Sequence, residues 1–250
     1  MPYLTLILLT IFLIIILLLL ITVIGKFPEP LPHSEKPIKD IVEVLFLWTL
    51  NIIFLAVYIF YLGPFFYTLI SNDIIPGVIL FSLTSLLIPL LFVILVNKWR
   101  FKDFGIINKV ESWSVALFGF ISYFLIAFFS YFLFQQTSIP LNYLIIFLYS
   151  NAFLEEFFHR SILQSKLERA LGQRRSILYG GLLFGLIHMP ANLFSFLDHQ
   201  DILLTIFSFS LQLIRGWTYG IIYTKTRNVF PGVLCHYVSN WLGSIILTFL

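Results

Sequence analysis

Long apolar segments follow one another along almost the whole chain, and they restrict its possible folds more than any other feature. Only 11% of the 250 residues are charged, whereas a soluble domain carries roughly 25%. The sequence therefore predicts an all-α polytopic membrane helix bundle. We count eight segments that could cross about 30 Å of hydrocarbon: Leu4–Ile24, Ile41–Tyr61, Ile74–Val96, Trp113–Phe134, Leu141–Gln164, Ser176–Phe196, Ile202–Thr224 and Val229–Leu250.

The basic residues alternate between successive loops. Every lysine and arginine except Arg160 and Arg215 lies in the first, third, fifth or seventh loop. The positive-inside rule places these loops in the cytosol and both termini outside. We expect a multi-pass protein of a prokaryotic plasma membrane, in contact with lipid. The net charge is only +3 and the sequence has no long block of consecutive basic residues, so nucleic acid is not an expected partner.

Three polar clusters interrupt the later apolar segments. They read Glu-Glu-x-x-x-Arg, Phe-x-x-x-His and His-x-x-x-Asn. Residues four apart share one face of a helix, so Glu156 and Arg160 can pair, as an orienting or a purely structural pair. Ionisable groups inside a membrane indicate a functional site. The polar residues concerned are Glu155, Glu156, Arg160, His188, His236 and Asn240.

The depth of these residues supports a common site. At about 1.5 Å per helical residue, Glu155, His188, His236 and Asn240 lie roughly 10 to 18 Å from the cytosolic ends of their segments. Arg215 lies in the same layer and has no acidic residue within reach on its own helix. We expect Glu155 or Glu156 to be its partner.

Carboxylate, imidazole and amide groups together suit hydrolysis. A carboxylate can accept a proton from water, histidines can orient that water or hold a metal, and an amide can donate to an oxyanion. A proton or cation pathway would use the same residue types. Two neighbours are given other roles: we expect His159 to reach towards the cytosolic interface and Cys235 to serve packing. We interpret Gly181-x-x-x-Gly185 and Gly216-x-x-x-Gly220 as ordinary helix packing.

The three motifs resemble those of the CPBP family, which comprises type II CAAX prenyl proteases and bacteriocin-processing enzymes and is also called the Abi family. The family is marked by E-E-x-x-x-R, F-x-x-x-H and H-x-x-x-N. This chain has them in that order as Glu155 to Arg160, Phe184 to His188 and His236 to Asn240. Residues 141–250 would then form the catalytic core and residues 1–140 a four-helix scaffold, within one membrane domain.

The resemblance implies a glutamic or metallo-endopeptidase whose site opens towards the cytosol. Glu155 would activate water with His188 assisting, His236 and Asn240 would stabilise the oxyanion, and Glu156, Arg160 and Arg215 would support the site. Its substrate would be a peptide or membrane protein, with or without a prenyl group.

Two questions stay open in the sequence. Glu155, His188 and His236 could hold zinc with one open position, yet the same atoms serve a metal-free mechanism. We favour the latter, because a carboxylate in a low-dielectric site is already a competent base. The resemblance also allows a non-enzymatic bacteriocin-immunity protein, and the polar cluster itself allows a non-enzymatic protein that binds or translocates a cation or ligand.

Overall fold

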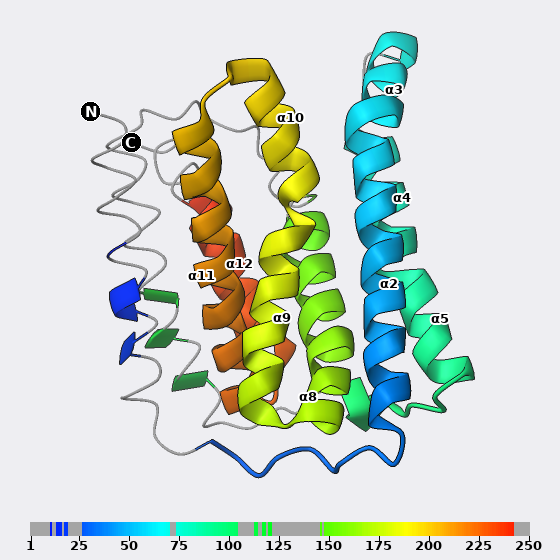
Figure 1. The fold of residues 1–250 in the computed structure, drawn as a ribbon, viewed down its shortest axis with the longest axis vertical. Coiled ribbons are helices and arrows are strands. Elements are labelled where there is room, and N and C mark those ends of the chain that lie inside the picture. Colours follow the sequence, from blue (N-terminus) through cyan, green and yellow to red (C-terminus); the bar gives the residue numbers. More distant parts are fainter. Residues whose placement is uncertain are drawn as a thin grey trace.

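The computed structural model describes residues 27–70, 74–104 and 148–242, with isolated positions at 11, 14–16, 18–19, 113–114, 117–118, 120–121 and 146. Every element within this part of the chain is a helix, which agrees with the predicted all-α class. Figure 1 shows the helices side by side, with α2 to α5 forming one group and α8 to α12 another.

Several of the helices contain π-helical turns. The N-terminal group comprises α2 (Pro37–Val57), the π-helix η1 (Tyr58–Leu62), α3 (Gly63–Ile70), α4 (Ile74–Ser82), the π-helix η2 (Leu83–Leu87), α5 (Ile88–Leu95) and the 3₁₀-helix η3 (Phe101–Phe104). The C-terminal group comprises the π-helices η4 (Leu148–Leu154) and η5 (Phe157–Gln164), then α8 (Ser165–Leu171), α9 (Gln173–Ile187), α10 (Met189–His199), α11 (Ile202–Thr226), α12 (Val229–Tyr237) and the π-helix η6 (Val238–Leu242).

Three continuous helices in the described residues are long and apolar enough to cross a membrane. They are Pro37–Leu69, Ile74–Leu95 and Gln173–His199, and they contain most of the second, third and sixth predicted segments. The chain is therefore a membrane protein. Most of the first and fourth predicted segments lies outside the described residues, so the total of eight spans stays a prediction, as do the orientation and the positions of the termini.

The fifth helix continues beyond its predicted end. We expected the span to finish at Gln164, but α8 extends the same helix to Leu171. Gly172 then adopts a φ of 83°, a left-handed conformation that favours glycine, and α9 starts at once. Ser165 to Glu168 are buried rather than part of a solvent-exposed loop.

Close contact between α9 and α11 fixes the centre of the C-terminal group. A Cβ atom on Gly216 would lie 2.6 Å from the Gly181 carbonyl oxygen. Only glycine permits this separation, because any side chain would overlap the facing backbone. The two glycine motifs therefore serve helix packing, as interpreted from the sequence.

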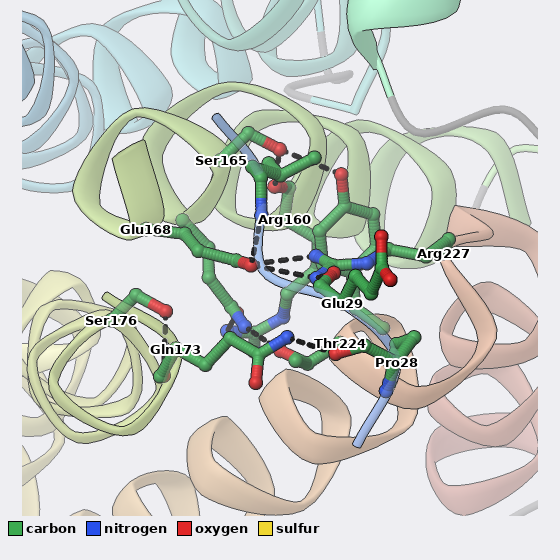
Figure 2. A network of polar contacts seen from close by, with 12 residues as sticks. Pro28, Glu29, Arg160, Ser165, Glu168, Gln173, Ser176, Thr224 and Arg227 are labelled. Carbon is green, nitrogen blue, oxygen red and sulfur yellow. Dashed lines mark hydrogen bonds and ion pairs between the residues drawn. The ribbon is translucent and has the colours of Figure 1, made fainter. Parts of the chain in front are cut away.

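A network of polar contacts joins the predicted first, fifth and seventh loops (Figure 2). Arg227 forms two hydrogen bonds of 2.6 Å with the Glu168 carboxylate, and Glu168 Oε1 also accepts from the Leu31 amide at 3.0 Å. Gln173 donates to the Pro28 carbonyl oxygen at 2.6 Å. The extended segment 27–36 thereby crosses the ends of α8 and α11, so loops one, five and seven share a side.

A second ionic cluster joins α2 to α8. Lys166 is 1% exposed, and its Nζ lies 2.7 Å from both Asp40 Oδ1 and Glu43 Oε2. Asn97 donates to Glu43 Oε2 at 3.0 Å. Buried charges of this kind are tolerated when they are paired and hydrogen-bonded, and the pairing holds the N-terminal group against the C-terminal group.

Candidate active site

The two glutamates of the first motif lie in a short α-helical turn between η4 and η5. π-Helical turns often occur at functional sites because they redirect individual side chains. Here the adjacent carboxylates point to different neighbours. Glu155 lies on the wall of a cavity, whereas Glu156 is fully buried against Arg160 and α12.

Glu156 is held on two sides. Arg160 Nε donates to Glu156 Oε2 at 3.0 Å, which confirms the pair expected from the four-residue spacing. His236 Nδ1 lies 3.0 Å from Glu156 Oε1. A Cβ atom on Gly232 would lie 3.2 Å from Glu156 Oε2, so this glycine lets α12 approach the carboxylate. Both oxygens of Glu156 are thus used inside the protein.

Glu155 has a different environment. Its Oε2 atom lies 3.7 Å from His188 Nε2 and 3.9 Å from His236 Nε2. Both separations exceed hydrogen-bond distance, and this buried oxygen has no hydrogen-bond partner in the described residues. Glu155 is therefore the carboxylate that remains available for chemistry.

Hydrogen bonds define the tautomers of both histidines. His188 Nδ1 lies 2.8 Å from the Phe184 carbonyl oxygen, which can only accept, so Nδ1 donates its proton. His236 Nδ1 donates in the same way to Glu156 Oε1, while the other oxygen of this carboxylate accepts from Arg160 Nε. In neutral rings the proton at Nδ1 leaves Nε2 as an acceptor, and both Nε2 atoms lie near Glu155.

Phe184 forms the apolar centre of the site. Its ring centroid lies 5.0 Å from that of His188, 5.8 Å from that of His236 and 5.1 Å from that of His159. The Arg160 guanidinium lies 5.0 Å from the same centroid. Phe184 is fully buried, so the second motif supplies the surface on which the titratable rings are packed.

Arg215 bonds to a residue that we did not expect. Arg215 Nη1 donates to Asn240 Oδ1 at 3.2 Å, and within the described residues neither Glu155 nor Glu156 forms a direct ion pair with it. Glu155 nevertheless lies within electrostatic range of the Arg215 charge, so a carboxylate partner of Arg215 stays a prediction. The bond fixes Asn240 so that its amide NH₂ points away from Arg215.

A cavity of about 310 Å³ lies beside Glu155, between the two helix groups. Glu155, His159 and His188 lie on its core side, with Ser150 and Asn151. The opposite wall comes from α2, η1, α4 and η2 and is largely apolar, and it includes Phe54, Leu55, Tyr58, Val78 and Phe81. The N-terminal group therefore contributes residues to the site as well as support.

Sequence reasoning missed the polar residues that the N-terminal group contributes. Asn51 lines the cavity and donates to Ser85 Oγ at 2.7 Å, and Thr84 lies on the same wall. A single asparagine within an apolar segment was the available signal. Gln164 was also missed: its side-chain amide connects Arg160 to the Gly220 carbonyl oxygen and to Thr224 of α11.

The expectation for His159 was wrong. Its side chain does not reach the cytosolic interface; it is 2% exposed and lies on the cavity wall between aromatic rings. His159 follows Glu155 by four positions, and the face that they share turns inward at this depth. Cys235 is fully buried, which agrees with a packing role.

The residues named for zinc do not form a ligand group in this arrangement. Among the described residues, no three His, Cys, Asp or Glu side chains converge to hold a metal ion. The donor types would suit zinc, but we derive no chemical step through a metal. The zinc site stays a prediction.

Residues 137–242 are similar to a known protein family. This range, which contains all three motifs, matches the family model described as "Type II CAAX prenyl endopeptidase Rce1-like". No curated protein and no solved structure matches the chain.

Proposed function

We propose that the chain is an intramembrane endopeptidase of the type II CAAX prenyl endopeptidase family, whose model matches residues 137–242, and that Glu155 activates the attacking water. The single observation that carries this proposal is the arrangement around Glu155 Oε2. That oxygen is buried and without a partner in the described residues, and the Nε2 atoms of two histidines lie 3.7 and 3.9 Å away.

Glu155 Oε2, His188 Nε2 and His236 Nε2 are three acceptors that could bind one water molecule. This water would donate one hydrogen to Glu155 and the other to an imidazole nitrogen. A lone pair of the water oxygen would then point towards a substrate. The hydrogen bond between His236 Nδ1 and Glu156 supports this assignment. Because it places the proton of a neutral His236 on Nδ1, the Nε2 atom is left to accept a hydrogen bond from the water. We therefore assign His188 and His236 to orientation of the water.

We assign the stabilisation of the oxyanion to Asn240. Because Arg215 donates to Asn240 Oδ1, the amide NH₂ of Asn240 remains to donate to a substrate oxygen. The predicted contribution of His236 to the oxyanion would require a doubly protonated ring, whose two nitrogens both donate. The proposal does not need that state.

The reaction proceeds in two steps. The water oxygen bonds to the scissile carbonyl carbon while its proton passes to Glu155, and the carbonyl electron pair moves to the oxygen as an oxyanion. The oxyanion then re-forms the double bond, the carbon–nitrogen bond breaks, and Glu155 returns the proton to the leaving amine. Glu156 and Arg160 keep His236 in place throughout.

The cavity supports a substrate with a large apolar part. Its volume of about 310 Å³ lies at the lower end of the range for small-molecule sites, and aromatic and aliphatic side chains form the wall opposite Glu155. We propose that this wall receives an apolar side chain or a prenyl group attached to the peptide. That the site opens towards the cytosol stays an expectation from the family resemblance.

The test is cleavage of a quenched peptide library in detergent, with prenylated and unprenylated members. Glu155→Gln keeps the shape of the side chain and removes the base, so we expect at least a thousandfold lower kcat and an unchanged Tm. Glu35→Gln, at an exposed position, is the matched control. Full activity of the Glu155→Gln enzyme would refute the proposal. A chelator arm, with zinc added back, tests the zinc site: loss and recovery of activity would require a metal.

A further inference from the structure

His159 occupies a position that a purely apolar ring would fill. Its imidazole packs edge-on against Phe158 and Phe184, at centroid distances of 5.2 and 5.1 Å. It is 2% exposed. Phenylalanine could make the same contacts at this position, so packing does not account for the two ring nitrogens.

The histidine is also unsatisfied. Its Nδ1 atom is buried and has no hydrogen-bond partner in the described part of the chain. Buried polar atoms are nearly always hydrogen-bonded, because leaving one unpaired costs free energy. His188 and His236 each have an Nδ1 partner, so His159 is the unpaired imidazole of the three around Phe184.

The position of His159 indicates where a partner would come from. It lines the same cavity as Glu155 and His188, whereas Ser161, which is equally buried and also unpaired, does not. A molecule that fills this cavity is therefore within reach of His159. If the proposed function holds, that molecule is a peptide with its scissile bond beside Glu155.

The two walls of the cavity favour different parts of a peptide. The wall from α2 and α4 is mainly apolar and suits a side chain or a lipid group. The core wall presents polar groups and suits the main chain, whose amides need partners when they leave water. Asn240 is assigned to the scissile carbonyl oxygen, so a main-chain N–H next to the scissile bond still needs an acceptor.

We propose, on the basis of the proposed function, that His159 is a substrate-contacting residue that accepts a hydrogen bond from a main-chain N–H of the bound peptide, one or two residues from the scissile bond. The residue then helps to set the register of the peptide against Glu155. Neither the motif spacing nor the pairing of the other histidines assigns it such a role.

The test combines variants of His159 with peptides in which one amide at a time, next to the scissile one, is replaced by an ester. An ester removes the N–H donor and keeps the chain length. For the wild type we expect one such peptide to show a fall in kcat/KM on the order of tenfold, the usual effect of one hydrogen bond. For His159→Phe we expect a similar fall with the all-amide peptide and no further fall with that ester.

Two further variants separate contact from folding. Ser161→Ala also removes an unpaired buried polar atom, but away from the cavity, and should show the ester dependence of the wild type. His159→Gln retains an acceptor and should recover part of the lost kcat/KM. His159→Leu, which also removes the acceptor, replaces His159→Phe if that variant does not fold. Equal ester effects at every position in the wild type and in the variant without the acceptor would overturn the proposal.

Binding measurements distinguish this inference from the proposed function. The same fluorescent peptides are titrated against Glu155→Gln and Glu155→Gln/His159→Phe, which should not cleave them. If the wild type cleaves nothing, the proposed function fails, and ester-dependent binding lost in the double variant still supports the His159 contact. Binding without that dependence, or no saturable binding of any peptide, overturns the contact.

Discussion

His236 stands between the two glutamates of the first motif, with Nδ1 3.0 Å from Glu156 Oε1 and Nε2 3.9 Å from Glu155 Oε2. One imidazole thereby connects a fully paired carboxylate to an unpaired one. The adjacent glutamates consequently have different roles: Glu156 orients the ring, and Glu155 faces the cavity.

Glu156→Gln should destabilise the protein, in contrast to Glu155→Gln. The change leaves the buried Arg160 without its counter-charge, and breaking a buried pair costs about 3–5 kcal/mol. We expect Tm to fall by roughly 10 °C. Thermal unfolding of both variants in the same detergent checks this, and an equal Tm for the two would contradict the division of roles.

Phe184→Leu should reduce activity more than stability. Leucine keeps the apolar character but removes the ring that contacts His188, His236 and Arg160, so the histidines lose a defined orientation. We expect kcat to fall about tenfold to a hundredfold, with a loss of stability of roughly 1–2 kcal/mol. Cleavage assays beside thermal unfolding measure the two effects, and Phe230→Leu on the exposed side of α12 serves as control.

Arg215→Lys should lower kcat with little change in KM. Lysine keeps the positive charge but cannot reproduce the planar donor geometry that holds Asn240 Oδ1, so the amide is no longer fixed for the oxyanion. We expect a loss of about tenfold or more. Because Arg215 acts through Asn240, Arg215→Lys/Asn240→Ala should be no slower than Asn240→Ala alone. Additive losses would show that Arg215 acts independently.

Arg227→Gln should release the segment 27–36 from the ends of the helices. Arg227 holds both Glu168 and the Glu29 carbonyl oxygen, so its loss leaves the buried Glu168 carboxylate uncompensated. We expect a destabilisation of about 3 kcal/mol and faster proteolysis within residues 27–36. Glu168→Gln/Arg227→Gln should recover part of the Tm. A double variant as unstable as the sum of the single variants would disprove the coupling.

Local spacing allowed several features to be predicted from the sequence. Their spacing of four residues identified Glu156 and Arg160 as a pair on one helix face, and the structure confirms the contact at 3.0 Å. The apolar segments identified a helical membrane protein, and the three motifs pointed to the family whose model matches residues 137–242. The number of spans and the catalytic roles stay predictions.

Contacts between helices could not be predicted in the same way. The sequence did not show that Arg215 bonds to Asn240, that His159 lines the cavity, or that Lys166 and Glu168 of a presumed loop are buried in ion pairs. These contacts depend on the rotation and separation of helices whose motifs lie far apart in the chain. The sequence by itself determined the helical class and the pairs within one helix, because residues four apart in a helix lie close together on one face. Only the tertiary structure decided which carboxylate faces the cavity, because that choice depends on how several helices pack together.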